Sequence, residues 1–182
     1  MAENEFIVTP RSRKELREIA ARVREVFGCT APKIDIVRIV ELELQKLEPE
    51  FVFHTPYAAE MGDIHGLTNP VEKWMYIRED VYNGALKDKG RDRMTMAHEL
   101  GHYLLHRRVD FPFVPPGSSV PPYRRSEWQA NTFGAELLIC AAHLDGCTCV
   151  EDLVERFCVS YEGARLRILA FAAEAPQRSR TA

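Results

Sequence analysis

The stretch Met94–His106 reads MTMAHELGHYLLH and contains the pattern H-E-x-x-H, made by His98, Glu99 and His102. Its apolar residues recur at helical spacing, so we expect a helix of about residues 91–108. Two histidines four residues apart lie on nearly the same helix face, about 6 Å apart along the axis, and both can reach one metal ion. Glu99 is turned roughly 100° from His98, which places a carboxylate beside that ion. The stretch therefore predicts a zinc-dependent peptidase with Glu99 as its catalytic carboxylate.

A catalytic zinc ion needs a third protein ligand, because such sites use three protein ligands and keep one position open for water. The downstream candidates are five side chains: His106, Asp110, Glu127, Glu136 and His143. His106 lies about 12 Å along the helix axis from His98, too far to share an ion. We expect His106 to pack in the interior or to support a ligand.

A second predicted helix, from Ser126 to about Cys140, carries two of these candidates. Ser126 and Gln129 fit a capping box at its start. Glu127 and Glu136 are nine residues apart, so at 100° per residue they point to opposite faces. Glu136 shares its face with Gln129 and Thr132, which we interpret as a solvent-facing stripe.

Glu127 shares its face with Asn131 and Gly134, which we interpret as inward-facing. A buried carboxylate needs a partner, and a metal ion would supply one. Asn131 could hydrogen-bond a ligating imidazole, and Gly134 would allow the neighbouring helix to approach closely. The sequence therefore predicts zinc ligation by His98, His102 and Glu127, although this donor set also suits iron, manganese or cobalt.

The segments ahead of this site predict an α+β arrangement. Helices at about 12–27 and 34–47 form an N-terminal layer over about 12–48. The first helix carries six basic residues between Arg11 and Arg24, but three interleaved glutamates favour a solvated face over a nucleic-acid surface. Short aromatic and β-branched runs at 51–53 and 74–77 predict strands.

A third strand is expected within 63–68, which gives a small, mainly antiparallel sheet whose edge could pair with an extended substrate. The sheet and catalytic core then span about 50–140. Residues 109–125 contain five prolines and are expected to form a loop. Short helices at 151–157 and 161–173 complete a helical C-terminal portion at about 150–173.

We expect a single domain over residues 1–175 and a disordered tail at 176–182. The chain has 182 residues, 46% hydrophobic and 28% charged, with a net charge of −3, which gives no drive towards nucleic acid or an anionic membrane. It has no window apolar enough to span a bilayer, and its N-terminus lacks an apolar signal core. Five cysteines without framework spacing favour reduced thiols, so we expect a cytoplasmic protein. Composition does not indicate an oligomeric state.

A second metal site at Cys147, Cys149 and His143 is not favoured, because no further cysteine pair completes a four-ligand set.

The motif AHELGHYLLH followed by SEWQANTFGAELL closely resembles the ImmA/IrrE family of gluzincin-type metallopeptidases, whose pattern joins H-E-x-G-H to E-x-x-A-N-x-F-A. The later stretch DLVERFCVSYEGARLRI also resembles that family. The resemblance implies that His98, His102 and Glu127 are the metal ligands and that Glu99 is catalytic, in agreement with the helix faces. Gly134 departs from the family's usual alanine, and Cys140-Ala141 replaces a common Met-Pro.

The resemblance implies a zincin-like fold: N-terminal helices, a small sheet, the H-E-x-x-H helix and a helical C-terminal portion. It also implies a protein substrate, a helix-turn-helix repressor encoded nearby, whose cleavage controls genes of a mobile element or a stress response. The alternative is a regulatory protein that binds a transcription factor without cleaving it and uses the metal only for structure. The open fourth position argues against that alternative, because structural zinc sites are closed by four protein ligands. We expect neither nucleic acid nor a membrane as a direct partner.

Overall fold

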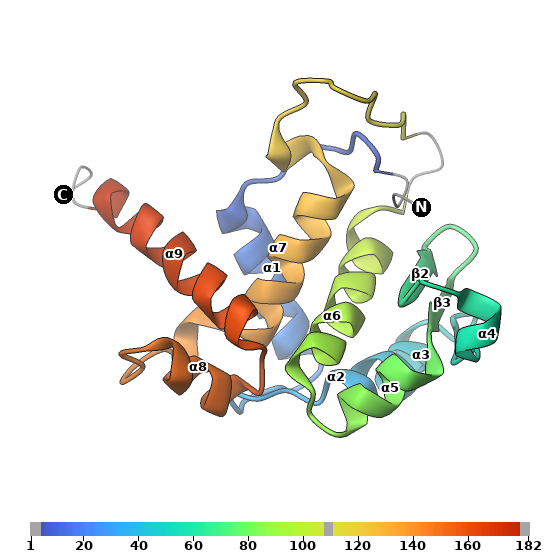
Figure 1. The fold of residues 1–182 in the computed structure, drawn as a ribbon, viewed down its shortest axis with the longest axis horizontal. Helices are drawn as coiled ribbons and strands as arrows, with labels where there is room; N and C mark the ends of the chain where they lie inside the picture. Colours follow the sequence, from blue (N-terminus) through green and yellow to red (C-terminus); the bar gives the residue numbers. More distant parts are fainter. Residues whose placement is uncertain (1–4, 108–110, 179–182) are drawn as a thin grey trace.

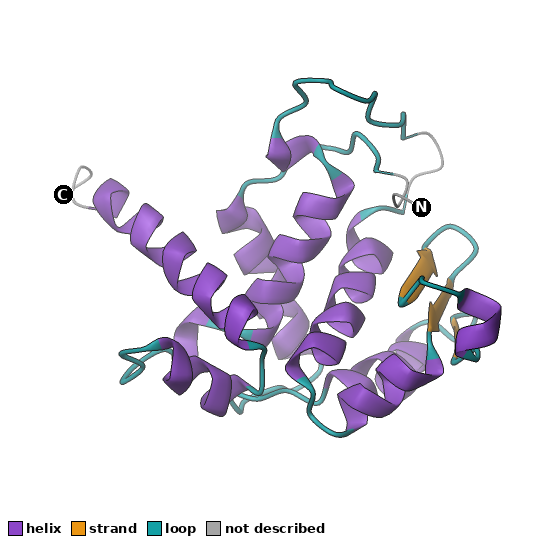
Figure 2. Ribbon diagram, in the orientation of Figure 1, coloured by secondary structure: helices purple, strands orange, loops and turns teal. Residues whose placement is uncertain are grey.

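The computed structural model describes residues 5–107 and 111–178 (Figures 1 and 2). In chain order the described elements are α1 (Arg13–Val26), α2 (Ile36–Arg38), a π-helical turn (Ile39–Glu43), α3 (Leu44–Leu47), β1 (Val52–His54), α4 (Ala58–Met61), β2 (Gly66–Asn69), β3 (Trp74–Ile77), α5 (Glu79–Leu86), α6 (Gly90–Leu105), α7 (Ser126–Leu138), α8 (Val150–Phe157) and α9 (Tyr161–Arg178). Two 3₁₀ turns, Pro122–Arg124 and Ala141–His143, precede and follow α7. The fold is α+β, as predicted.

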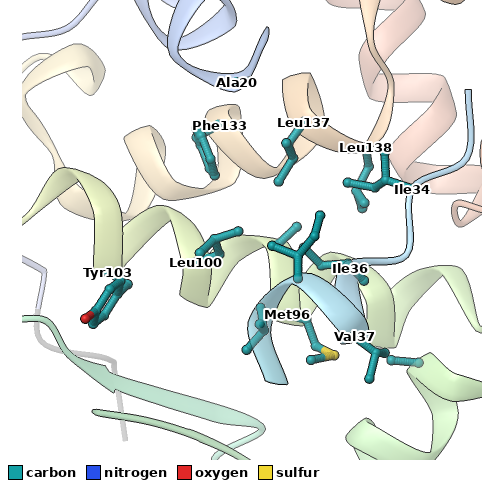
Figure 3. Packing of buried hydrophobic residues seen from close by; sticks show 14 of the residues in the cluster. Ala20, Ile34, Ile36, Val37, Met96, Leu100, Tyr103, Phe133, Leu137 and Leu138 are labelled. Carbon is teal, nitrogen blue, oxygen red and sulfur yellow. The ribbon is translucent and has the colours of Figure 1, made fainter. Parts of the chain in front are cut away.

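Helices α6 and α7 lie side by side at the centre of the molecule (Figure 1). Helix α1 packs on α7, whereas α5 and strand β2 pack on α6. Side chains of α2, α6 and α7 meet in one apolar cluster that includes Ile36, Leu100 and Phe133, all with 0% exposure (Figure 3). This central contact anchors the two helices that carry the predicted metal ligands.

Helix α1 begins where the sequence predicts. The Ser12 hydroxyl accepts a hydrogen bond from the Glu15 backbone N–H at 3.2 Å, and the Glu15 carboxylate accepts one from the Ser12 N–H at 2.6 Å. These two bonds form a capping box, which satisfies N–H groups that the first helical turn leaves without partners. At the other end Gly28 adopts a φ of +64°, a conformation that ends the helix.

The basic face of α1 is not uniformly solvated, which corrects the prediction. Arg24 is only 4% exposed, and its guanidinium donates to the carbonyls of Ala31, Pro32 and Leu137. Leu137 lies in the last turn of α7, and Ala31 and Pro32 lie in the segment between α1 and α2, so these carbonyls have no helical partner and an inward-turned arginine satisfies them.

The second predicted helix, 34–47, is present as α2, the π-helical turn and α3 in succession. It begins at Asp35, whose carboxylate accepts from the Arg38 N–H at 3.0 Å.

The predicted strands are present, but the sheet is mixed rather than mainly antiparallel. Its order is β1-β3-β2; β3 pairs antiparallel with β2 and parallel with β1. The reason is that β2 and β3 form a hairpin, and β3 then inserts between β2 and the earlier strand. Strand β2 is thus an edge of this sheet and lies against α6 (Figure 1).

Two short helices, α4 and α5, were not predicted, and α9 is longer than predicted. It continues to Arg178, so residues 176–178 are helical rather than part of a disordered tail. Residues 179–182 lie outside the described part of the chain.

The Pro-rich loop, residues 111–125, is held by an N-terminal arm, residues 5–9. The arm and loop exchange backbone hydrogen bonds, including Ile7 N–H to Pro112 carbonyl and Val8 N–H to Arg124 carbonyl, both at 2.8 Å. The rings of Phe6 and Phe113 stack with their centroids 4.9 Å apart. The predicted loop is therefore extended backbone partly paired with the start of the chain; its residues 109 and 110 lie outside the described part.

Within the described ranges, none of the helices has both the length and the apolar character needed to cross a membrane.

Candidate metal centre

Two glycines allow α6 and α7 to approach closely beside the site. A Cβ atom added to Gly101 of α6 would lie 3.0 Å from the Cα atom of Ala130 in α7. One added to Gly134 of α7 would lie 3.3 Å from the backbone of Ala97 and His98, as the sequence led us to expect for this glycine. The small helix separation brings the start of α7 within reach of the two histidines of α6.

His98, His102 and Glu127 come together between these helices. The Nε2 atoms of the two histidines lie 3.0 Å apart. Glu127 Oε2 lies 3.3 Å from His98 Nε2, and Glu127 Oε1 lies 3.1 Å from His102 Nε2. One ligand atom from each of these three side chains lies within 4.8 Å of the other two, so the group could hold a metal ion.

These distances fit a tetrahedral zinc site. Nitrogen and oxygen ligands about 2.0–2.1 Å from a tetrahedral ion lie roughly 3.3 Å from one another. The three measured separations, from 3.0 to 3.3 Å, are close to that value. The donor set of two imidazoles and a carboxylate also leaves one position without a protein ligand, as in catalytic sites.

The electrostatics of Glu127 favour the ionised form that a metal ligand needs. Its partial burial by itself raises the pKa of this carboxyl, but hydrogen bonds from the Nε2–H groups of His102 and His98 outweigh burial and hold the pKa well below its ordinary value. A bound metal ion would take the place of those two Nε2 protons.

The second nitrogen of His98 is held by Asn131. His98 Nδ1 lies 3.0 Å from Asn131 Oδ1, and because an amide oxygen only accepts, Nδ1 carries the proton. This leaves the lone pair of His98 Nε2 directed at the site. The predicted contact between Asn131 and a histidine ring is present, but Asn131 itself is exposed, so this face borders an open site rather than the interior.

The second nitrogen of His102 begins a chain of hydrogen bonds. Gln129 donates its amide N–H groups to the carbonyls of Thr9 and Tyr123 at 2.7 and 2.8 Å, which fixes its Oε1 as an acceptor. His106 Nε2 lies 3.3 Å from that oxygen and therefore donates, so His106 Nδ1 accepts from His102 Nδ1 at 3.1 Å. The Nε2 lone pair of His102 is again left for a metal.

This chain confirms the supporting role expected of His106, which is only 6% exposed. Burial and the neighbouring charge of His102 lower the pKa of His106 to about 3, so its imidazole is neutral at physiological pH.

The interpretation of Gln129, Thr132 and Glu136 as a solvent-facing stripe is wrong. All three are buried, with 0%, 4% and 2% exposure. The reason is that α7 is covered on more than one side, so its polar residues bond inside the protein. Glu136 receives a two-pronged contact from the buried Arg167 of α9 and a 2.9 Å hydrogen bond from Arg17 of α1.

The predicted capping box at Ser126 is also absent. Ser126 is the first residue of α7, and its hydroxyl accepts from the Phe6 N–H of the N-terminal arm at 2.9 Å. Both polar residues of the expected box, Ser126 and Gln129, instead tie the arm to α7.

Glu99 directly follows His98 on α6 and is only 4% exposed. Its Oε2 atom accepts a 2.6 Å hydrogen bond from the Thr68 hydroxyl of strand β2. A Cβ atom on Gly66, two residues earlier on that strand, would lie 2.7 Å from Glu99 Cγ. A shielded carboxylate is thus placed on the H-E-x-x-H helix, next to two imidazoles that converge on one point.

A family model described as the IrrE N-terminal-like domain (Peptidase M78) matches residues 49–169, about two thirds of the chain. The chain belongs to the ImmA/IrrE family of metallopeptidases. The resemblance seen in its two helical motifs is therefore confirmed. A search of curated proteins finds no significant match.

Tyr103 lies on the same helix as His98 and His102 but is a packed aromatic residue. It is 0% exposed, its ring packs edge-on against Phe51, and its hydroxyl donates to Glu48 at 2.6 Å. Burial and that hydrogen bond raise the pKa of Tyr103.

The other candidate ligands do not join the site. His143 lies in the turn after α7 and is not part of the metal group, and Asp110 lies outside the described residues. The described part of the chain places no metal-binding group at Cys147 and Cys149. All five cysteines are free thiols, as expected.

The sequence patterns did not indicate the contacts of Thr68 and Gly66 with Glu99, and they wrongly placed Gln129 on a solvent-facing stripe. The expected strand at 63–68 contains the first two, but a strand does not reveal which helix it will cover. Gln129 could be found only from the partners that it reaches, Thr9 and His106.

Proposed function

We propose that this protein is a zinc-dependent endopeptidase in which His98, His102 and Glu127 hold the metal and Glu99 is the catalytic carboxylate. The observation that supports this most is the near-tetrahedral spacing of three ligand atoms beside a buried carboxylate on the same helix. Bound there, zinc supplies a Lewis acid that makes water a nucleophile near neutral pH and polarises a peptide carbonyl.

In this proposal Glu99 moves the proton. Its carboxylate accepts a proton from the attacking water and then delivers it to the nitrogen of the leaving amine. General acid/base work of this kind typically contributes about 10²–10⁴ in rate. Burial of Glu99 to 4% exposure keeps bulk water from competing for that proton.

Strand β2 offers a way to hold the substrate. It is an edge of the sheet and lies against α6, and it carries the residue that contacts Glu99. An extended peptide can add to such an edge by backbone hydrogen bonds, with little dependence on side-chain identity. The substrate segment would then be an exposed, extended part of a protein chain.

The substrate we propose is a helix-turn-helix repressor encoded near this protein, whose cleavage would release genes of a mobile element or a stress response. The family resemblance supports this choice. The proposal includes no nucleic-acid partner, because two arginines of the basic helix α1, Arg17 and Arg24, are bonded to Glu136 and to backbone carbonyls.

The test is to incubate the zinc-loaded protein with the neighbouring helix-turn-helix protein and to identify fragments by mass spectrometry. We expect Glu99→Gln to bind one equivalent of zinc but to lose cleavage, and Glu127→Ala to lose zinc. Glu162→Gln, at an exposed glutamate on α9, is the matched control and should behave as wild type. Wild-type cleavage by Glu99→Gln would contradict the mechanism, and an intact partner in a stable complex would favour binding without proteolysis.

A further inference from the structure

Glu99 is held from outside its own helix, by strand β2. The Thr68 hydroxyl donates to Glu99 Oε2 at 2.6 Å, across 31 residues of sequence. A hydroxyl bonded to a carboxylate at this distance makes a short, charge-assisted hydrogen bond, stronger than one between neutral groups.

The register of the hairpin places Thr68 on the inner face of the sheet. Thr68 pairs with Met75, and Gly66 pairs with Ile77. Met75 and Ile77 are both 0% exposed, so their strand partners Thr68 and Gly66 face the same interior. A slip of one residue would turn Thr68 outwards and bring Leu67 against Glu99.

The turn after β2 pins this register. The Asn69 Oδ1 atom accepts from the N–H groups of Val71 and Glu72, each at 3.0 Å. Such a side-chain-to-backbone turn fixes where the hairpin reverses, and so fixes which strand residue faces Glu99.

Gly66 makes room for the carboxylate that Thr68 holds. An added Cβ would lie 2.7 Å from Glu99 Cγ, 2.7 Å from Oε1 and 2.9 Å from Cδ. The end of the Glu99 side chain therefore lies against a bare stretch of backbone, with the Thr68 hydroxyl bonded to one of its oxygens. A glutamate has several rotatable bonds, and this combination restricts where its carboxylate can go.

We propose that Thr68 is a positioning residue that orients the catalytic carboxylate of Glu99. This inference rests on the proposed peptidase function. This bond joins the Thr68 hydroxyl to Glu99 and involves neither a donor atom of the proposed metal ligands nor the backbone edge of β2. Loss of the hydroxyl should therefore reduce kcat and leave KM and zinc affinity nearly unchanged. Displacement of a catalytic group by about 1 Å can cost about 10²-fold in rate.

Three variants test this proposal. Thr68→Val removes the hydroxyl but keeps the β-branched shape suited to a strand, and it should lower kcat roughly 10- to 100-fold. Thr68→Ser keeps the hydroxyl and should stay within about 3-fold of wild type. Thr148→Val makes the same chemical change at an exposed position before α8, where the hydroxyl donates to the Asp152 carboxylate at 3.0 Å, and should leave kcat unchanged. The substrate is a quenched fluorescent peptide that contains the bond found by mass spectrometry.

A double variant tests whether Thr68 acts through Glu99. Adding Thr68→Val to Glu99→Gln should not lower the residual rate further, because the group that Thr68 orients has already been changed. An equal additional loss in that background would overturn the proposal, as would Thr68→Ser being as slow as Thr68→Val.

A measurement without catalysis separates this inference from the proposed function. In metal-free protein with ¹³C-labelled glutamate, the Glu99 carboxyl signal is identified by its absence in Glu99→Gln. That signal should shift in Thr68→Val and return in Thr68→Ser at constant pH. An unchanged signal with unchanged kcat would overturn the role of Thr68 while leaving the peptidase intact, whereas a wild-type protein that cleaves nothing would overturn the peptidase function itself.

Discussion

His102 and His106 face each other through their Nδ1 atoms, 3.1 Å apart, one helical turn along α6. His106, which lies too far from His98 to share an ion with it, is thus the acceptor that sets the proton position on His102, a proposed metal ligand. His106→Leu removes that acceptor and should weaken zinc binding about 10- to 100-fold, as is typical when the partner of a ligating histidine is lost. Competition with a zinc chelator measures this affinity.

The control for this variant is His54→Gln, at an exposed histidine on strand β1. Thermal unfolding should be recorded for both proteins, because a buried substitution also lowers stability. If His106→Leu unfolds at a lower temperature but binds zinc as tightly as wild type, His106 has only a packing role.

The stability of the metal-free protein should depend on pH through His106. Its folded pKa of about 3 lies below the value of 6.5 for an unperturbed histidine, so the unfolded chain takes up the proton first as pH falls. The contribution is fully present above pH 6.5 and is lost between pH 6.5 and about 3, by at most about 1.4 kcal/mol per pH unit. Urea unfolding at pH 7, 6 and 5 gives the free energy of unfolding at each pH. This free energy should fall less steeply with falling pH in His106→Leu than in wild type, and an equal pH dependence in the two proteins would refute this assignment.

Glu136 and Arg167 form a buried ion pair between α7 and α9, both with side chains at 0% exposure. Glu136→Gln leaves a buried guanidinium without its anion and should cost roughly 3–5 kcal/mol of unfolding free energy. Glu136→Leu combined with Arg167→Met should cost less than Glu136→Gln alone, because the buried guanidinium is removed together with its anion. The other partners of Glu136, Arg17 and Arg13, have side chains 21% and 30% exposed and keep contact with water. Denaturant titration of the double variant and of its two single variants, Glu136→Leu and Arg167→Met, gives the comparison. A loss in the double variant equal to the sum of the two single losses would argue against a coupled pair.

Gly101 and Gly134 offer a matched test of helix separation. Gly101→Ala places a methyl group 3.0 Å from the backbone of Ala130, so α6 and α7 must move apart and both stability and zinc affinity should fall. In Gly134→Ala the nearest atom, also at 3.0 Å, is the flexible end of Met94, and the backbone of Ala97 and His98 lies farther away, at 3.3 Å. There the gain of about 1 kcal/mol from alanine in a helix offsets the tighter contact, and stability should stay near wild type. Equal effects of the two changes would show that backbone approach is not what Gly101 provides.

The sequence predicted the centre of the fold because its signals there are local. The H-E-x-x-H pattern depends on spacing within one helix, and α1 is delimited by Ser12, Glu15 and Gly28, all within or beside it. Helix periodicity separates Glu127 from Glu136, and it is Glu127 that the structure places against the two histidines.

Predictions failed where the answer depends on which elements cover a face. Periodicity shows that Gln129 and Glu136 share a side of α7, but not that α1 and the N-terminal arm lie against that side. The same applies to Thr68, whose role follows from strand β2 packing on α6, and to the parallel pairing of β1 with β3. Each of these contacts joins residues far apart in sequence, and no local pattern encodes such a contact.

The attachment of the N-terminal arm has a consequence for protein synthesis. Gln129, which supports His106 and through it His102, bonds the carbonyl of Thr9, 120 residues earlier in the chain. At roughly 5–20 residues per second, the arm is synthesised about 6–24 seconds before its partner. The early helices can form during that interval, but the support of His102 is completed only after α7 has emerged. A nascent chain therefore cannot acquire the finished metal centre until most of the protein has been translated.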